Sequence, residues 1–125
     1  MKIVALIARI LLGLLFLVFG LNTFLHFIPM PPPSGLAGQF LGALFVSRYL
    51  AVVAVIQVAT GALLLINRYV PLALTLLGPV IFNIFLFHLL LEPTGLPLAF
   101  ITVILWAVVF YWHRAAFSGI FAQNA

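Results

Sequence analysis

The side chains that could support acid–base or ligand chemistry are few, and they lie inside long apolar runs. The candidates for holding a cofactor are Asn22, His26, Gln57, Asn83 and His88. A histidine can transfer a proton or ligate a metal, and neutral amides can orient a carbonyl group. Asn22 and His26 are four residues apart, as are His88 and Glu92, so each pair is predicted to share a helix face. Asn83 and His88 are five apart, about 140° around a helix, so they are predicted to face different directions.

The composition excludes most other reaction types. The chain has no cysteine, and Glu92 is its one acidic residue. Thiol nucleophiles, disulfide exchange, paired carboxylates and a Ser-His-Asp triad are therefore excluded within this sequence. The lack of cysteine and of paired carboxylates also predicts no metal site. The formal net charge of +4 comes from basic residues that do not cluster, so we expect no nucleic-acid binding. Chemistry would depend on the polar side chains above or on a bound cofactor.

The apolar runs identify a membrane protein. Of the 125 residues, 67% are hydrophobic and 5% are charged, which is too little polar surface for a soluble domain. About 20 residues at ~1.5 Å rise cross a ~30 Å hydrocarbon core. We predict an all-α integral membrane protein, a four-transmembrane-helix bundle in one domain over residues 1–125. The predicted spans are 3–28, 48–66, 70–91 and 96–114, with a short interfacial helix at 36–46 between the first two.

The basic residues predict the orientation of this bundle. Four spans place both termini on one side, and four of the five basic residues are predicted there: Lys2, Arg9, Arg68 and Arg114. Arg9 lies inside the first span and is expected to extend toward the headgroups. Arg48 and Glu92 are predicted on the opposite, exofacial side. The positive-inside rule then places both termini in the cytoplasm of a cell inner (plasma) membrane. The candidate cofactor residues fall in the exofacial half.

Further residues are predicted to have structural roles. Gly13 and Gly20 are seven residues apart on the first span and predict a close-packing stripe, either as a groove for a partner helix or within the bundle. Pro79 cannot donate to the Thr75 carbonyl and predicts a kink in the third span. Arg48 and Glu92 at the exofacial rim are predicted to fix register with a partner.

Several apolar segments carry a family pattern. They are ARILLGLLFLVFGLN at 8–22, QVATGALLL at 57–65, NRYVPLALT at 67–75, Asn83 to His88, and Glu92-Pro93. In these segments the chain resembles the DoxX family of small bacterial membrane proteins, over nearly its whole length from Ala8 to Phe117. That family is named for a subunit of a thiosulfate:quinone oxidoreductase, and some members associate with redox partners. Members often carry an acidic residue near the position of Gln57, which is a neutral amide here. The resemblance implies no catalytic residues.

Three functions stay open. The first is an auxiliary subunit of a larger electron-transfer or photosynthetic membrane complex, not catalytic on its own and contacting only lipid and that complex. The alternative is a quinone-linked oxidoreductase subunit of the thiosulfate:quinone type, with a quinone held by the candidate residues in the exofacial half. The second alternative is a haem or chlorophyll site with His26 and His88 as axial ligands. We expect the first, because the loops are minimal and no catalytic set is complete.

Overall fold

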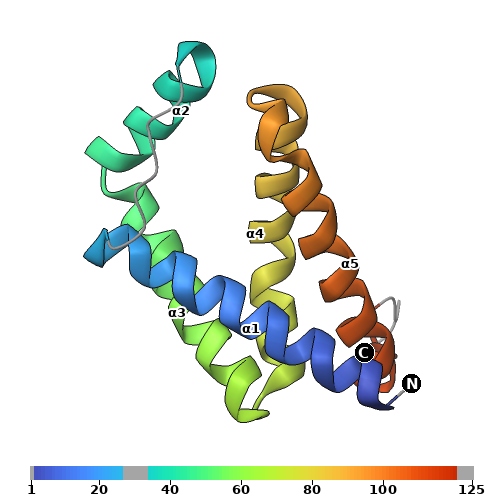
Figure 1. Cartoon of the computed structure of the whole chain (residues 1–125). Coiled ribbons are helices and arrows are strands. Elements are labelled where there is room, and N and C mark those ends of the chain that lie inside the picture. Colours follow the sequence, from blue (N-terminus) through green and yellow to red (C-terminus); the bar gives the residue numbers. More distant parts are fainter. Residues whose placement is uncertain (1, 27–33, 121–125) are drawn as a thin grey trace.

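A computed structural model describes residues 2–26 and 34–120 of the chain. This part is helical, with turns between the helices (Figure 1). Its elements are α1 (Lys2–Leu25), α2 (Gly35–Val46), α3 (Tyr49–Ile66), α4 (Val70–Leu90), the 3-10 helix η1 (Pro93–Gly95), α5 (Leu96–Trp112) and the 3-10 helix η2 (Arg114–Phe117).

Four of these stretches are long and apolar enough to cross a bilayer. They are α1, α3, α4 and the continuous stretch Pro93–Trp112, whereas Gly35–Val46 is shorter. The predicted all-α fold, with four membrane-length helices and a shorter helix between the first two, is confirmed. By helix length and composition the chain is a multi-pass membrane protein.

The four long helices close a ring. α1 packs against α3 and α5, and α4 packs against the same two helices. Inside the ring lies a core of aliphatic and aromatic side chains that includes Leu12, Phe16, Leu64, Leu74, Leu77 and Val109. The described ends of the chain lie at one end of the molecule, which we call the termini end (Figure 1). The turns after α2 and α4 lie away from it, at what we call the loop end.

α1 and α3 end where the backbone enters the left-handed region. α1 ends at Leu25 because His26 has a φ of 52°, three residues before the predicted end of the span; positions 27 and 28 lie outside the described residues. α3 ends at Ile66, because the next residue, Asn67, has a φ of 58°; its N–H donates to the Leu63 and Leu64 carbonyls. Asparagine tolerates this conformation better than most residues, so the local sequence favours a tight turn between α3 and α4.

Glycines bring α1 and α3 into backbone contact. A Cβ atom built on Gly61 of α3 would lie 2.6 Å from the Leu17 nitrogen of α1, and one on Gly13 would lie 3.0 Å from the Gly61 oxygen. A Cβ on Gly20 would lie 2.9 Å from a methyl group of Val58. Of the two roles predicted for Gly13 and Gly20, packing within the bundle is therefore the one observed. A groove for an external helix at these glycines is ruled out by α3, which fills it.

Arg9 joins α1 to the end of α3. Its Nη1 donates hydrogen bonds to the Leu64 carbonyl and, at 3.3 Å, to the Leu65 carbonyl. The last carbonyls of a helix lack donors within that helix, and a cation there is favoured by the helix dipole. The half-buried guanidinium is thus held by protein backbone, a contact that its position in the sequence did not reveal.

Candidate functional site

Two of the candidate residues lie in or beside the seam between α1 and α3. Asn22 is buried, with 7% of its surface exposed. Gln57 is half-buried, and its Cβ lies 3.1 Å from a Cβ built on Gly20, so it faces α1. The main-chain oxygen of Gln57 accepts a hydrogen bond of 3.2 Å from the Thr60 hydroxyl. These residues contribute to contact between two helices.

His26 does not share a face with Asn22, and that prediction was wrong. The prediction assumed that the helix continues through His26, whereas the positive φ at His26 ends it. The His26 N–H still donates to the Asn22 carbonyl at 2.9 Å, but the His26 side chain is exposed while Asn22 is buried. A histidine in the left-handed region is uncommon, and sequence spacing alone does not signal it.

Asn83 lies on the surface of α4 that faces away from the other helices. Its Nδ2 donates to the Pro79 carbonyl at 2.8 Å, and both residues are exposed. Thr75 is exposed one turn before Pro79 and donates to the Pro71 carbonyl at 2.8 Å. Thr75, Pro79 and Asn83 are spaced four apart, so they form one stripe. We call this stripe, with the exposed Leu72, Leu76 and Phe82 beside it, the outer face of α4.

His88 belongs to the turn between α4 and α5. Its Nδ1 lies 3.1 Å from the Glu92 main-chain oxygen, which fits an Nδ1–H donor and leaves Nε2 as an acceptor. The ring lies against Gly95, where a Cβ atom would collide with it. Glu92 in turn accepts a 2.8 Å hydrogen bond from the Thr94 hydroxyl. The predicted shared helix face of His88 and Glu92 was wrong, because α4 ends at Leu90 and Glu92 is not helical; the two residues meet through the main chain of Glu92.

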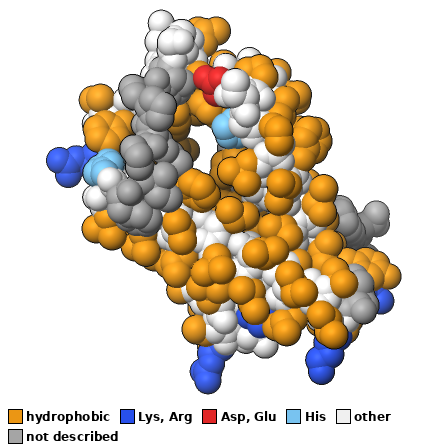
Figure 2. Space-filling view, in the orientation of Figure 1, with side chains coloured by type: hydrophobic (Ala, Val, Ile, Leu, Met, Phe, Trp, Pro, Cys, Tyr) orange, Lys and Arg blue, Asp and Glu red, His pale blue; other side chains and the backbone are white. Residues whose placement is uncertain are grey.

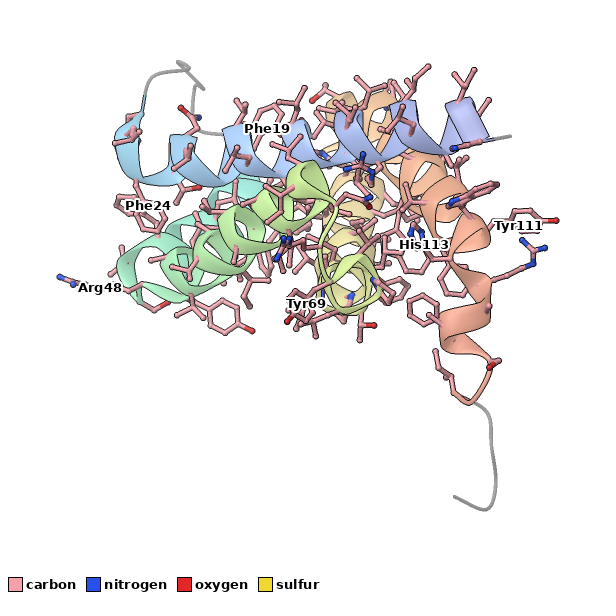
Figure 3. All side chains as sticks on the ribbon, turned by 90° about the horizontal axis from the view of Figure 1, so that it is seen from below. Phe19, Phe24, Arg48, Tyr69, Tyr111 and His113 are labelled. Carbon is pink, nitrogen blue, oxygen red and sulfur yellow. The ribbon has the colours of Figure 1, made fainter. Side chains whose placement is uncertain are left out.

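Arg48 and Glu92 lie on different turns at the loop end. Arg48 precedes α3 with a φ of 65°, is exposed, and points away from the helices (Figure 3). In Figure 2 the one red patch is Glu92, the chain's only acid, on the side of α4 and α5. His26 is exposed just after the end of α1, whereas His88 is half-buried in the last turn of α4.

The candidate polar residues thus occupy four places rather than one, with His26 exposed just after the end of α1. Asn22 and Gln57 lie in or beside the α1–α3 seam, Asn83 lies on the outer face of α4, and His88 lies in the α4–α5 turn. Within the described ranges, no group of three His, Cys, Asp or Glu side chains could hold a metal ion. Several span residues donate to carbonyls of their own helix, among them Thr60, Thr75, Asn83 and Thr102.

A pocket between α4 and α5 was not anticipated from the sequence. It has a volume of about 370 Å³ and is lined by Gly78, Ile81, Phe82, Phe85, Phe100, Val103 and Trp106. At one end Phe85 and Phe100 meet edge to face at 5.1 Å. At the other end the Trp106 Nε1 donates to the Leu74 carbonyl across the two helices at 3.0 Å. The one available signal was Gly78, which leaves space beside the Trp106 ring at 3.7 Å.

Comparison with known proteins identifies no family for this chain. No protein-family model, curated protein or solved structure matches it. The established description is therefore that of a small multi-pass membrane protein with four long apolar helices.

Proposed function

We propose that the protein is an auxiliary integral-membrane subunit that docks on a larger membrane protein through the outer face of α4. The observation that carries the proposal is the exposure of Asn83 and Thr75 within a membrane-length helix. Polar side chains in transmembrane segments usually face the bundle interior or another helix. Here two of them face outward, and the described helices leave this surface uncovered.

Hydrogen bonding supports docking on this face. The Asn83 Nδ2 uses one hydrogen for the Pro79 carbonyl, which leaves its Oδ1 as an acceptor on an exposed side chain. Pro79 has no N–H, so the Thr75 carbonyl on the same stripe lacks its usual donor four residues on. Lipid chains satisfy neither acceptor. A partner helix with a Ser, Thr, Asn or Gln side chain at this depth would satisfy them.

The resemblance to the DoxX family suggests the kind of complex. A family named for an oxidoreductase subunit favours an electron-transfer assembly in a bacterial inner membrane, and a photosynthetic complex falls in the same class. Lys and Arg side chains gather at the termini end (Figure 2). Because basic residues are enriched on the cytoplasmic side of membrane proteins, this supports a cytoplasmic position for both termini. In this proposal Arg48 and Glu92 contact the partner at the loop end.

The quinone and pigment alternatives receive less support from the geometry. A quinone head group needs polar side chains that converge, whereas Gln57, Asn83 and His88 lie in three places and none lines the α4–α5 pocket. A haem or chlorophyll held by both His26 and His88 would need them on facing surfaces. The His26 side chain is instead exposed beyond the end of α1, and the His88 Nδ1 is already engaged by the Glu92 main-chain oxygen.

The test is recovery of the complex from native membranes. Tagged full-length protein is extracted in mild detergent, and we expect it to migrate with a larger membrane protein. Asn83→Leu removes this acceptor, and interhelical bonds of about 0.6–1.7 kcal/mol predict a loss of about 3- to 18-fold in association. Val55→Leu is the matched control, since Val55 is exposed on α3 and carries no polar atom.

Two results would contradict the proposal. One is extraction of the wild-type chain from native membranes as a monodisperse monomer. The other is equal recovery of the complex with Asn83→Leu and with Val55→Leu, while both variants melt like the wild type. If Asn83→Leu lowers the melting temperature instead, Asn83 stabilises the bundle itself and the outer face of α4 is not the docking surface.

A further inference from the structure

The pocket between α4 and α5 lies midway along two membrane-length helices, at the depth of the hydrocarbon core of a bilayer. Its α4 residues run from Gly78 to Phe85, in the middle of the helix Val70–Leu90. Its α5 residues, Phe100 to Trp106, are likewise interior to Leu96–Trp112. Phe82 and Phe100 form its rim and are 62% and 50% exposed. In a bilayer the mouth of the pocket therefore faces lipid tails.

The lining excludes ligands with polar head groups. All seven lining residues are aromatic, aliphatic or glycine, and none is charged. The one polar atom among their side chains, the Trp106 Nε1, already donates to the Leu74 carbonyl. A polar ligand would lose its hydrogen bonds to water and gain none here. Complementarity therefore requires an occupant with neither charge nor hydrogen-bonding groups at this depth.

The dimensions exclude a helix. From Gly78 to Phe85 the pocket extends about 10 Å along α4, at ~1.5 Å per residue. A helix segment of that length, 10–12 Å across, occupies roughly 800–1,200 Å³, whereas the empty space between the lining side chains is about 740 Å³ even with the open mouth included. A stable interface between two copies buries about 800 Å² on each partner, which a pocket of this size does not supply. A single extended hydrocarbon chain is narrow enough to enter.

We propose that this pocket binds one acyl chain of a membrane phospholipid. The chain would lie along α4 and α5, between the Phe85–Phe100 pair and the Trp106 ring, with the head group outside the pocket at the membrane surface. Gly78 leaves the space beside Trp106 open, because any side chain larger than alanine would enter it. This inference concerns the α4–α5 pocket, which meets the outer face of α4 at Phe82; the substitutions that test it lie on α5, so it is tested separately from partner docking.

Trp106 reports occupancy of the pocket. The chain has two tryptophans, so Trp112→Phe leaves Trp106 as the only one. Full-length Trp112→Phe protein is placed in phosphatidylcholine vesicles containing phosphatidylcholine with brominated acyl chains, which quench indole fluorescence on contact. Val103→Phe, added to this background, fills the pocket, and we expect it to reduce the quenching at least two-fold. Ile104→Phe is the matched control, since Ile104 is the neighbouring residue, is exposed, and does not line the pocket.

A second measurement identifies the occupant. After extensive detergent washing, mass spectrometry of intact protein from native membranes should show about one retained phospholipid with the wild type and with Ile104→Phe, and none with Val103→Phe. Equal quenching in all variants, or no retained lipid in the wild type, would overturn the proposal. Retention of a prenyl lipid in place of phospholipid would also overturn it, as would a dimer that Val103→Phe dissociates.

Discussion

The substitution Gly61→Ala tests whether backbone contact between α1 and α3 sets the stability of the bundle. The new methyl carbon would lie 2.6 Å from the Leu17 nitrogen and 2.8 Å from the Gly13 oxygen. Both atoms are main chain, so a side-chain rotation cannot relieve the contact. Reaching the ordinary contact distance of 3.4 Å requires α1 to move by about 0.8 Å.

The size of the effect follows from that displacement. A gap of 0.5–1 Å forfeits about a quarter to a half of the dispersion energy of each contact along the seam. Overpacking of this kind costs about 1–3 kcal/mol, and the better helix propensity of alanine offsets up to about 1 kcal/mol. We expect Gly61→Ala to lower the free energy of unfolding by about 1–2 kcal/mol.

Gly42→Ala provides the control. Gly42 is also helical, but a Cβ built there meets nothing within 4 Å. This substitution should leave stability unchanged or raise it by up to about 1 kcal/mol. Both variants can be compared by reversible unfolding in detergent micelles with increasing dodecyl sulfate, followed by circular dichroism. A Gly61→Ala protein as stable as Gly42→Ala would refute the close contact between α1 and α3.

Further predictions concern Arg9 and the orientation of the bundle. Arg9→Leu removes the donor to the Leu64 and Leu65 carbonyls and should lower the free energy of unfolding by about 1–3 kcal/mol. Arg9→Lys keeps a cation at this position and should lose less stability. Equal stability of Arg9→Leu and wild type in the same unfolding assay would contradict this prediction. Thr94 and Ser118 are both exposed, and each can be replaced by a single cysteine. The cysteine at 94 should react with an impermeant thiol reagent added outside intact cells, and the cysteine at 118 should not. The reverse pattern would show that the termini face outward.

The sequence by itself determined the helices and the membrane class. Length and apolarity are local properties of each run, so the spans ending near Ile66 and Leu90 were predictable within a residue or two. The turn at Asn67 was also predictable, because asparagine tolerates the left-handed conformation found there. The spacing of Gly13 and Gly20 identified a packing stripe, although it left open which helix would fill it.

Only the tertiary structure decided which way each helix faces. A helix that is apolar on all sides gives no amphipathic pattern from which to choose an inner face. The inward position of Asn22 and the outward position of Asn83 therefore depend on the packing of neighbouring helices. Arg9 and the end of α3 are more than fifty residues apart, so their contact also required the fold.

The α4–α5 pocket depends on the fold for the same reason. Its lining residues are apolar, as are the lipid-facing residues beside them, so composition does not separate the two groups. Phe85 and Phe100 become the two sides of one pocket end only when the turn through Gly95 brings α5 back along α4. Apolarity placed these helices in the membrane, while the packing of their backbones determined where space remained between them.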